Sequence, residues 1–396
     1  MRTLLLGVGM QGKAALHDLL RSTPVTEIIA ADRDLDALRA HISGLPGQAR
    51  LRCEPVEATD RESLDRLFCE KPDVAIDLMP PASTGIVARS AIEHGVHLVN
   101  TSYVNAEVLA LADEAAARGV TILPEFGMDP GIDLLLMAEA VRTLDTVESL
   151  RCYGGGIPEP AAAGNPLQYK ITWTMEGVLR SYHRPARLVR DGRVIEIGAD
   201  RIFAPENLHA IEIAGLGTLE AIPNGDALKY APLLGLDPGR LRELGRFTLR
   251  YPGHSAFWKK IAELHLLDDE PVLVDGAAVD RRRYLATALA PHLGYADDER
   301  DVAIIRVEVE GRKGGRPARA VGEVIDRRDL ATGLTAMSRT VGFTASIGAQ
   351  MITNGAITRR GLLSPVNDVP FAAFVEEAAR RGIELRMETL TGDKRG

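Results

Sequence analysis

Short apolar runs alternate with amphipathic patterns through the first third of the chain. Six runs flanked by Gly, Pro and Asp predict strands: RTLLLG, TEIIAAD, ARLRCEPV, DVAIDLM, VHLVNTS and VTILPEF. The segments between them predict helices: QGKAALHDLLR, LDALRAHI, DRESLDRLF, TGIVARSAIEHG and NAEVLALADEAAARG. This regular alternation favours an α/β fold with a parallel, doubly wound sheet of the Rossmann type and helices on both faces.

The pattern changes after about residue 145. The longer alternating segments ESLRCYGGG, LQYKITWTM, RFTLRYPG and the pair VAIIRVEVEG/ARAVGEVI predict a larger antiparallel or mixed sheet in an α+β domain, and RKGGR predicts a hairpin turn. Helical patterns return near residue 331, where small residues such as Gly342 and Gly348 would let another element approach closely. We therefore expect a dinucleotide-binding domain over residues 1–125, a substrate and dimerisation domain over 126–335, and a C-terminal helical segment over 336–396.

Composition narrows the class of protein. The chain has 396 residues, enough for two domains, with 45% hydrophobic and 26% charged residues, as in soluble globular proteins. The net charge is −8 and the basic residues are scattered, which disfavours nucleic-acid binding. The apolar N-terminal stretch is too short for a signal peptide or a membrane span, and the cysteines (Cys53, Cys69 and Cys152) are too few for a disulfide framework or a zinc site. We expect a cytoplasmic enzyme without a metal.

The motif GVGMQG, residues 7–12, satisfies G-x-G-x-x-G between a predicted strand and a predicted helix. Gly7 permits a tight turn, Gly9 lets the backbone approach a pyrophosphate, and Gly12 lets helix and strand pack closely. The pyrophosphate would then meet the N–H groups at the helix N-terminus. This context predicts a dinucleotide site.

Asp32 ends the second predicted strand, about 20 residues after the last glycine of the motif. A carboxylate there accepts hydrogen bonds from the ribose hydroxyls and repels a 2′-phosphate, so NAD is favoured. Arg33 follows directly and keeps NADP open. Ligands of such sheets lie beyond the carboxyl ends of the strands. The predicted cofactor contacts are Gly7, Gly9, Met10, Gln11, Gly12, Asp32, Arg33, Asp60, Met79, Pro80, Thr101 and Ser102.

The stretch PEFGMDPGID, residues 124–133, follows the sixth predicted strand and therefore belongs to the same functional rim. It carries three acids: Glu125, Asp129 and Asp133. Asp129 either takes part in catalysis or caps a helix that starts at Pro130, because Asp-Pro is common at helix starts.

Several ordered blocks resemble one known family. TSYV (101–104), EFGMDPGID (125–133), GGGIPEP (154–160), NPLQYKITW (165–173), LEAIPNGDALKY (219–230) and TLRYPG (248–253) resemble the glutamate-forming saccharopine dehydrogenases. AMSRTVGFTASIGAQMI and GAITRRGLL are more similar to the related L-lysine 6-dehydrogenases. The resemblance covers almost the whole chain. It implies hydride transfer from a nitrogen-bearing carbon to nicotinamide, a C-terminal segment that packs on the nucleotide domain, and a homodimer formed through the middle domain.

The resemblance also implies roles for single residues. In the family a tyrosine, an aspartate and a cysteine lie close to the substrate amine, and the first two correspond to Tyr103 and Asp129. The family's YCGG reads CYGG here, so Tyr153 takes the place of the cysteine and Cys152 faces the other side of the strand. A base role at Tyr153 is less favourable, because the reference pKa of tyrosine is about 10 and that of cysteine about 8.5.

A second departure concerns the substrate. The family's PNRD reads PNGD, with Gly225 in place of an arginine that resembles a clamp for a substrate carboxylate. Either Lys170, Lys229 or Arg246 substitutes for it, or the substrate lacks one carboxylate. The predicted substrate contacts are Lys170, Trp173, Asn224, Asp226 and His254, the last with a purely structural role as the alternative.

Together these features predict an NAD-preferring oxidoreductase that acts on the C–N bond of a lysine-derived or opine-like amino acid. Asp129 and Tyr103 would lie near the reacting carbon, and Lys170 would bind a carboxylate. One alternative is an L-lysine 6-dehydrogenase. Another is a non-catalytic, dinucleotide-binding sensor or scaffold, which the altered CYGG and PNGD blocks keep open.

Overall fold

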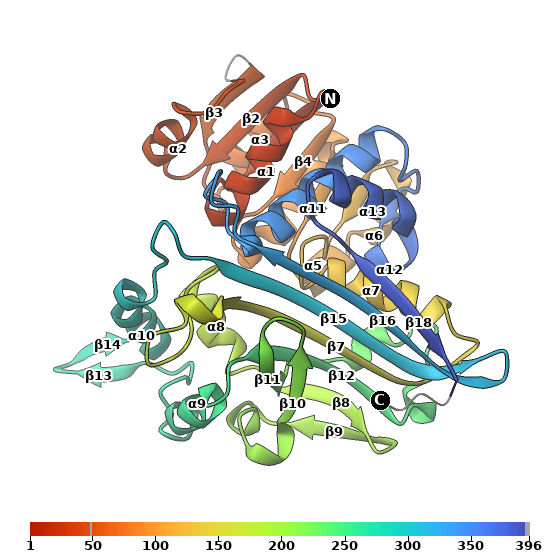
Figure 1. Ribbon diagram of the computed structural model, residues 1–396. Coiled ribbons are helices and arrows are strands. Elements are labelled where there is room, and N and C mark those ends of the chain that lie inside the picture. The colour runs from red at the N-terminus through yellow and green to blue at the C-terminus, as the bar shows by residue number, and fades with distance from the viewer. Residues whose placement is uncertain (48–49, 393–396) are drawn as a thin grey trace. The chain divides into compact units, whose positions relative to one another are not determined.

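The structure, a computed structural model, describes residues 1–47 and 50–392 (Figure 1). The chain folds into two compact units. The first comprises Met1–Leu135 and Ser338–Leu385, and the second comprises Leu136–Met337 together with the chain from Arg386 on. The chain thus passes from the first unit to the second at residue 136, returns to the first unit at residue 338, and enters the second unit again at residue 386.

The first unit is built on a parallel sheet, in the order β17-β6-β5-β4-β1-β2-β3 within the described residues. Strand residues such as Leu4, Leu5 and Leu6 are fully buried, as expected for strands covered on both faces. This confirms the predicted doubly wound α/β fold. The strands are β1 (Arg2–Leu6), β2 (Glu27–Asp32), β3 (Leu51–Pro55), β4 (Val74–Asp77), β5 (His97–Asn100), β6 (Thr121–Leu123) and β17 (Gly361–Leu362).

Helices follow the strands of this unit much as the periodicity predicts, except that the last one breaks in two at residues 110–111. Helix α11 returns to pack on α1: a Cβ on Gly342 would lie 2.5 Å from the carbonyl oxygen of Gln11. The helices are α1 (Met10–Arg21), α2 (Leu35–Ile42), α3 (Arg61–Phe68), α4 (Thr84–His94), α5 (Ala106–Leu109), α6 (Ala112–Ala117), α11 (Ala336–Thr353), α12 (Pro365–Asp368) and α13 (Phe371–Arg380). Helix α7 (Ile132–Arg142) leads out of the unit.

The second unit is built on a mixed sheet, in which β10-β11-β12-β7-β15-β16-β18 are neighbours and β8 joins β9 to β12. Strands β12 and β7 run parallel, and β15 and β16 form the predicted hairpin, with Lys313 opposite Arg316. The strands are β7 (Thr146–Pro158), β8 (Ala186–Arg190), β9 (Arg193–Ile197), β10 (His209–Ile213), β11 (Gly217–Pro223), β12 (Glu243–Arg250), β15 (Asp301–Lys313), β16 (Arg316–Arg327) and β18 (Arg386–Thr391).

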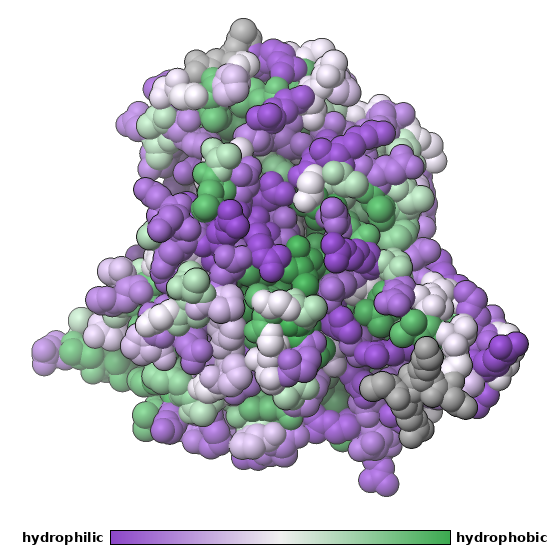
Figure 2. All heavy atoms as spheres, viewed as in Figure 1, coloured by the Kyte–Doolittle hydropathy of each residue, from purple (hydrophilic) through white to green (hydrophobic). Residues whose placement is uncertain are grey.

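Helices α8 (Met175–Ser181) and α9 (His254–Glu263) contribute to the apolar core on one face of this sheet. A small hairpin, β13 (Val272–Val274) and β14 (Ala277–Val279), precedes α10 (Arg281–Leu289). Its apolar side chains are unusually exposed, Leu273 at 73% and Val274 at 51%. Figure 2 shows hydrophobic surface along this hairpin.

Two sequence-based expectations are wrong. LQYKITWTM forms no strand but an irregular segment before α8, because its apolar side chains, such as Tyr169, are buried in the core without strand pairing. The C-terminal segment is not helical throughout, because β18 pairs antiparallel with β16 at the edge of the second sheet.

Candidate active site

The glycine-rich loop has the geometry that a dinucleotide requires. Gly7 follows β1 with φ of 85°, and a Cβ there would lie 2.9 Å from the carbonyl group of Leu78. A Cβ on Gly12 would lie 2.0 Å from the carbonyl oxygen of Gly7, so only glycine allows the close packing of α1. Gly9 faces open space, where a pyrophosphate can approach the first turn of α1 at Met10.

Asp32 lies at the end of β2, beside this loop. Its carboxylate accepts hydrogen bonds from the backbone N–H of Val8 (2.7 Å) and of Asp34 (3.0 Å). A carboxylate has about four acceptor positions, so it can also accept bonds from ribose hydroxyls. Gln11, a predicted cofactor contact, lies in the first turn of α1, and its Oε1 atom is buried without a hydrogen-bond partner.

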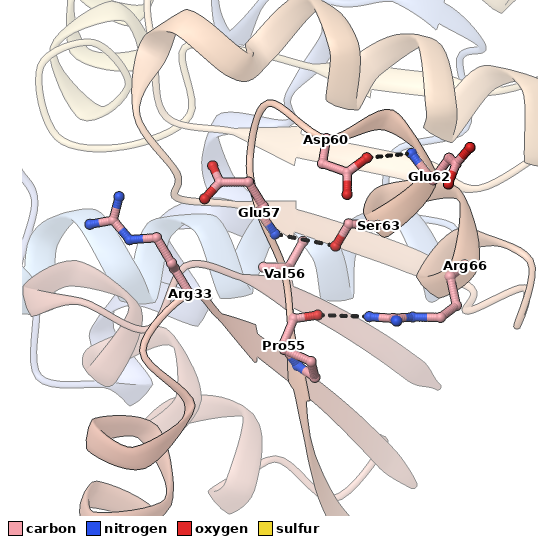
Figure 3. Close-up of a pocket in the computed structure, with 8 residues that line it drawn as sticks. All are labelled: Arg33, Pro55, Val56, Glu57, Asp60, Glu62, Ser63 and Arg66. Carbon is pink, nitrogen blue, oxygen red and sulfur yellow. Dashed lines mark hydrogen bonds between the residues drawn. The ribbon is translucent and has the colours of Figure 1, made fainter.

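A pocket of about 510 Å³ opens beyond the ends of β2 and β3 (Figure 3). Arg66 is turned toward the wall, where it donates to the carbonyl oxygen of Pro55 over 3.0 Å, and Asp60 caps α3 through the N–H of Glu62. The pocket has the position and size to receive the adenosine half of a dinucleotide. It is lined by Arg33, Pro55, Val56, Glu57, Asp60, Glu62, Ser63 and Arg66.

A buried polar chain orders the loops that follow β4 and β5. Asp77 accepts hydrogen bonds from the N–H of Met79 (3.0 Å) and the side-chain amide of Asn100 (2.6 Å). The side-chain oxygen of Asn100 (Oδ1) in turn accepts a hydrogen bond from the backbone N–H of Ser102 over 2.6 Å. Burial raises the pKa of Asp77 to about 6, against the effect of these hydrogen bonds. Sequence reasoning places Asn100 at this edge, beside the cofactor, but misses Asp77, although a polar residue that ends a buried strand was the available signal.

The three acids of PEFGMDPGID have different surroundings. Glu125 is buried and accepts a weak bond from the N–H of Val104 at 3.4 Å. Asp133 is fully buried and accepts the N–H of Gly131 at 2.7 Å, in the first turn of α7. Since α7 begins at Ile132, three residues beyond Asp129, the predicted cap role of Asp129 for a helix from Pro130 is wrong.

Asp129 instead meets the other predicted catalytic residue. The hydroxyl group of Tyr103 donates to Oδ1 of Asp129 over 2.8 Å, and both side chains are only partly buried. Tyr103 follows β5 and Asp129 follows β6, so the parallel sheet brings residues 26 positions apart to the same edge. The result is an accessible carboxylate with a phenolic hydroxyl bound to it, which suits the acceptance and return of a proton.

Tyr153 is placed differently from the expectation that its hydroxyl replaces a thiol near the substrate. It lies in the apolar core, where it stacks on Phe247 and its hydroxyl pairs with Nε2 of His209 at 3.1 Å. Burial raises the pKa of Tyr153 above its ordinary value. Its hydroxyl group therefore stays protonated and cannot act as a base. The strand alternation that turns Tyr153 into the core turns Cys152 to the opposite face.

Lys170 and His254 are also engaged within the second unit. Lys170, the predicted contact of a substrate carboxylate, forms an ion pair with the carboxylate of Glu299. His254 is buried and accepts a hydrogen bond from Tyr182 (2.7 Å), whose oxygen accepts one from Arg250 (2.9 Å). Burial, and then the charge of Arg250, lower the pKa of His254 well below its ordinary value, so it is neutral. Its surroundings match the structural alternative.

The remaining predicted substrate contacts lie on the second unit. The ring of Trp173 covers Gly177, where a Cβ would come within 2.4 Å of it. Asp226 pairs with Arg187 at 3.0 Å. Asn224 accepts a hydrogen bond from Arg184, a residue that the sequence analysis did not identify.

Other ligand classes receive little support from the described part of the chain. It contains no group of three or more His, Cys, Asp and Glu side chains that could hold a metal ion. It also has no helix of the length and apolarity that a bilayer crossing requires. Cys53, Cys69 and Cys152 form no disulfide within the described residues.

Comparison with known proteins places these features in a family. Residues 3–123 match the saccharopine dehydrogenase NADP binding domain, and residues 127–383 match the saccharopine dehydrogenase C-terminal domain. The first unit is therefore an NAD(P)-binding domain. The solved structure of apo saccharopine dehydrogenase (L-Glu forming) from Saccharomyces cerevisiae has the same fold, with a TM-score of 0.85 at 23% identity over 98% of this chain and 99% of that one.

Relatives differ in length. The saccharopine dehydrogenase (NADP+, L-glutamate-forming) of Schizosaccharomyces pombe is 27% identical, with 98% of each chain covered. The alpha-aminoadipic semialdehyde synthase of Arabidopsis thaliana is 26% identical over 90% of this chain, which spans only 40% of that longer protein. This chain spans 46% of the length of the mitochondrial alpha-aminoadipic semialdehyde synthase of Mus musculus. Since the two family models together account for nearly all of the sequence, the chain belongs to the saccharopine dehydrogenase family.

Proposed function

We propose that this protein is an NAD(P)-dependent oxidoreductase that oxidises the C–N bond of a saccharopine-type amino acid. The observation that carries the proposal is the Asp129–Tyr103 pair at the carboxyl edge of the nucleotide-binding sheet. An accessible carboxylate at that edge lies where substrates of such sheets react. The names of the relatives, saccharopine dehydrogenases that form L-glutamate, support the same substrate class.

The overall reaction sets the demands on the residues. A secondary amine loses its proton, the adjacent carbon loses a hydride, and water adds to the resulting iminium. The carbinolamine then collapses to an aldehyde and a free amino acid. When bound, NAD(P)+ supplies the hydride acceptor. Each proton that moves needs a positioned acceptor or donor.

Asp129 is the group that we assign to these proton transfers. Its carboxylate accepts the amine proton and releases it to solvent, and it then accepts a proton of the attacking water. The Tyr103 hydroxyl holds Oδ1 of Asp129, which orients the carboxylate and can return a proton to the leaving amine. The chain from Asp77 through Asn100 to Ser102 fixes the loop that carries Tyr103, so the pair is positioned before substrate arrives.

We further propose that NAD is preferred over NADP. Asp32 would face a 2′-phosphate, and three of the eight residues that line the adjacent pocket are acids: Glu57, Asp60 and Glu62. Of the two arginines there, Arg66 is bonded to a backbone carbonyl. The relatives of Schizosaccharomyces pombe and Pyricularia oryzae are named as NADP+ enzymes, so a preference for NAD would distinguish this chain from them.

L-lysine is the second candidate substrate, because Gly225 lacks the side chain that would bind an additional carboxylate. The decisive experiment measures NAD(P)H formation at 340 nm with saccharopine and with L-lysine, each with NAD and with NADP. We expect turnover of saccharopine with a higher kcat/KM for NAD. Turnover of lysine alone would assign the chain to the oxidative deaminases, and no turnover despite NADH binding would support a sensor or scaffold.

Substitution tests the assigned pair in the same assay. We expect Asp129→Asn to lower kcat by about 100-fold or more, because removal of a general base costs about 10²–10⁴-fold. NADH binding should stay unchanged. Asp113→Asn, at an exposed position of α6, is the matched control. Full activity of Asp129→Asn would remove Asp129 from the mechanism.

Two further proposals concern the whole protein. A homodimer is supported by the exposed apolar side chains of β13 and β14, since surface of this kind marks interaction sites. A reducing, cytoplasmic location is supported by three cysteines that form no disulfide within the described residues, because structural disulfides belong to oxidising compartments.

A further inference from the structure

A cysteine and a histidine meet at the surface of the first unit, away from the site described above. Cys69 directly follows α3 and His94 is the last residue of α4, and Sγ of the cysteine lies 3.3 Å from Nε2 of the histidine. Helices of such a unit run against the strands, so the carboxyl ends of α3 and α4 lie at the sheet edge opposite to the glycine-rich loop. The two side chains therefore belong neither to the dinucleotide site nor to the Asp129–Tyr103 pair.

The hydrogen-bond partners of His94 set its tautomer. Its Nδ1 atom lies 2.9 Å from the backbone carbonyl oxygen of Ser90, which can only accept, so Nδ1 carries the ring hydrogen. In the neutral ring, Nε2 is then an acceptor, and the thiol of Cys69 donates to it. The imidazole also stacks on the buried ring of Phe68, with 6.3 Å between the centroids, which supports this orientation. The sulfur thus faces the nitrogen that can take its proton.

A carboxylate lies on the other side of the imidazole. Oδ1 of Asp65 is 3.9 Å from Nδ1 of His94, and this oxygen is buried without a hydrogen-bond partner. Oδ2 of the same carboxylate accepts a hydrogen bond from Nε of Arg61 over 2.9 Å, which fixes its position. When the imidazole takes the thiol proton, its positive charge therefore lies beside a negative one. A nucleophile, a base within reach of it and an acid behind the base form the arrangement that activates a thiol.

The three cysteines of the chain differ in their access to solutes. Cys152 is buried, and Cys53 is half-buried, where burial raises the pKa of its thiol. Cys69 is exposed. It lies at the carboxyl end of α3, where the helix dipole does not stabilise an anion. Reaction at Cys69 therefore depends on the transfer of its proton to His94.

We propose that Cys69 is a thiol-modification site that exchanges with low-molecular-weight disulfides. The thiol proton passes to Nε2 of His94, and Sγ attacks one sulfur of the disulfide. A bond forms between Sγ and that sulfur, the bond between the two sulfurs of the reagent breaks, and the leaving thiolate takes the proton from His94. Cys69 is oxidised to a mixed disulfide and the released half of the reagent is reduced to a thiol. The reaction uses no dinucleotide, so it is independent of the proposed function.

The test treats the protein with 2-hydroxyethyl disulfide, a small neutral reagent, and follows the mixed disulfide at each cysteine by peptide mass spectrometry. We expect Cys69 to react about tenfold faster in the folded protein than in the chain unfolded with urea, because only the fold places His94 beside it. Exposure alone cannot give this result, since unfolding exposes every cysteine. Cys53 and Cys152 should react more slowly in the folded protein than in the unfolded chain. A folded Cys69 that reacts no faster than the unfolded one would overturn the proposal.

Substitution of the proton acceptor gives a second, independent measurement. His94→Gln should lower the rate at Cys69 about tenfold in the folded protein and leave the rate in urea unchanged. Asp65→Asn should lower it less, because the carboxylate acts only through the imidazole. His265→Gln is the matched control, since His265 is an exposed histidine of the second unit that also pairs with an acid, Asp268. An unchanged rate in His94→Gln, with a thermal midpoint that shows a folded protein, would contradict the proposed step.

Discussion

At the scale of single residues, three aspartates have different roles because their burial and hydrogen-bond partners differ. Asp133 is fully buried and accepts a backbone N–H, whereas Asp129 is partly exposed and accepts a hydrogen bond from the hydroxyl group of Tyr103. Asp77 is buried among hydrogen bonds that position two loops. Of these three acids, Asp129 is the one that combines partial exposure with a neighbouring hydroxyl group that can exchange a proton.

Asp77 should make stability depend on pH. Burial raises its pKa to about 6, compared with about 3.9 in an unfolded chain, so the folded state binds the proton more tightly. This stabilisation is fully present below the unfolded pKa and is lost as pH rises through the folded pKa. Between pH 5 and 7, the free energy of unfolding should fall by about 1 kcal/mol relative to Asp77→Asn. Urea unfolding of both proteins measures the difference, and a constant difference would contradict the raised pKa.

Residues whose task is local could be predicted from the sequence. Gly12 approaches the carbonyl group of Gly7 within the same loop, so the motif spacing contains that contact. Gly7 has the left-handed backbone that the turn needs, although the atoms closest to it belong to the distant Leu78. Tyr153 and Lys170 could not be placed, because the choice of the core-facing side of a strand and the partner Glu299 depend on elements far along the chain.

At the scale of elements, secondary structure could be predicted where apolar and polar residues alternate regularly and the backbone pairs accordingly. The prediction failed where side chains are buried without such pairing. The hairpin of β15 and β16 has alternating residues and a Gly-Gly turn, and its register agrees with them. The segment LQYKITWTM alternates as well, but its tyrosine and threonine are buried in irregular backbone. Strand β18, RMETLT, is short and largely exposed at a sheet edge, so its sequence has little strand signal.

The contact of α11 with α1 should be sensitive to a single methyl group. In Gly342→Ala, the new Cβ would lie 2.5 Å from the oxygen of Gln11 and 2.7 Å from the nitrogen of Ala15, so the backbone of a helix must shift. We expect a loss of stability of about 2 kcal/mol, despite the better helix propensity of alanine. NADH should bind more weakly, because Gln11 lies in the glycine-rich loop.

Gly44→Ala is the control for this substitution, since the space around Gly44 is open and its backbone is not left-handed. Differential scanning calorimetry and NADH fluorescence titration give the two quantities. Equal stability of Gly342→Ala and the wild type would mean that α11 moves on α1 without cost.

At the scale of the whole molecule, the exposed hairpin of β13 and β14 bears on assembly. If a second copy covers it, Leu273→Asp places a charge in the interface and should raise the dimer dissociation constant about tenfold or more. Sedimentation equilibrium of the wild type should show a dimer. Leu109→Asp, at an exposed leucine of α5 in the first unit, should leave the dimer intact. A monomeric wild type, or a Leu273→Asp dimer of unchanged affinity, would assign the interface elsewhere.

The return of the chain to its first unit has a consequence for synthesis on the ribosome. Strands β1 to β6 emerge early, but α11, which packs against α1, and the edge strand β17 are made only after residue 335. Domains tend to fold as units while the chain emerges, and exposed apolar surface in the meantime favours aggregation. Most of the second unit can fold while the nascent nucleotide-binding sheet still lacks α11. Binding of a chaperone to the uncovered face of α1 during translation would protect the chain until α11 and β17 have been made.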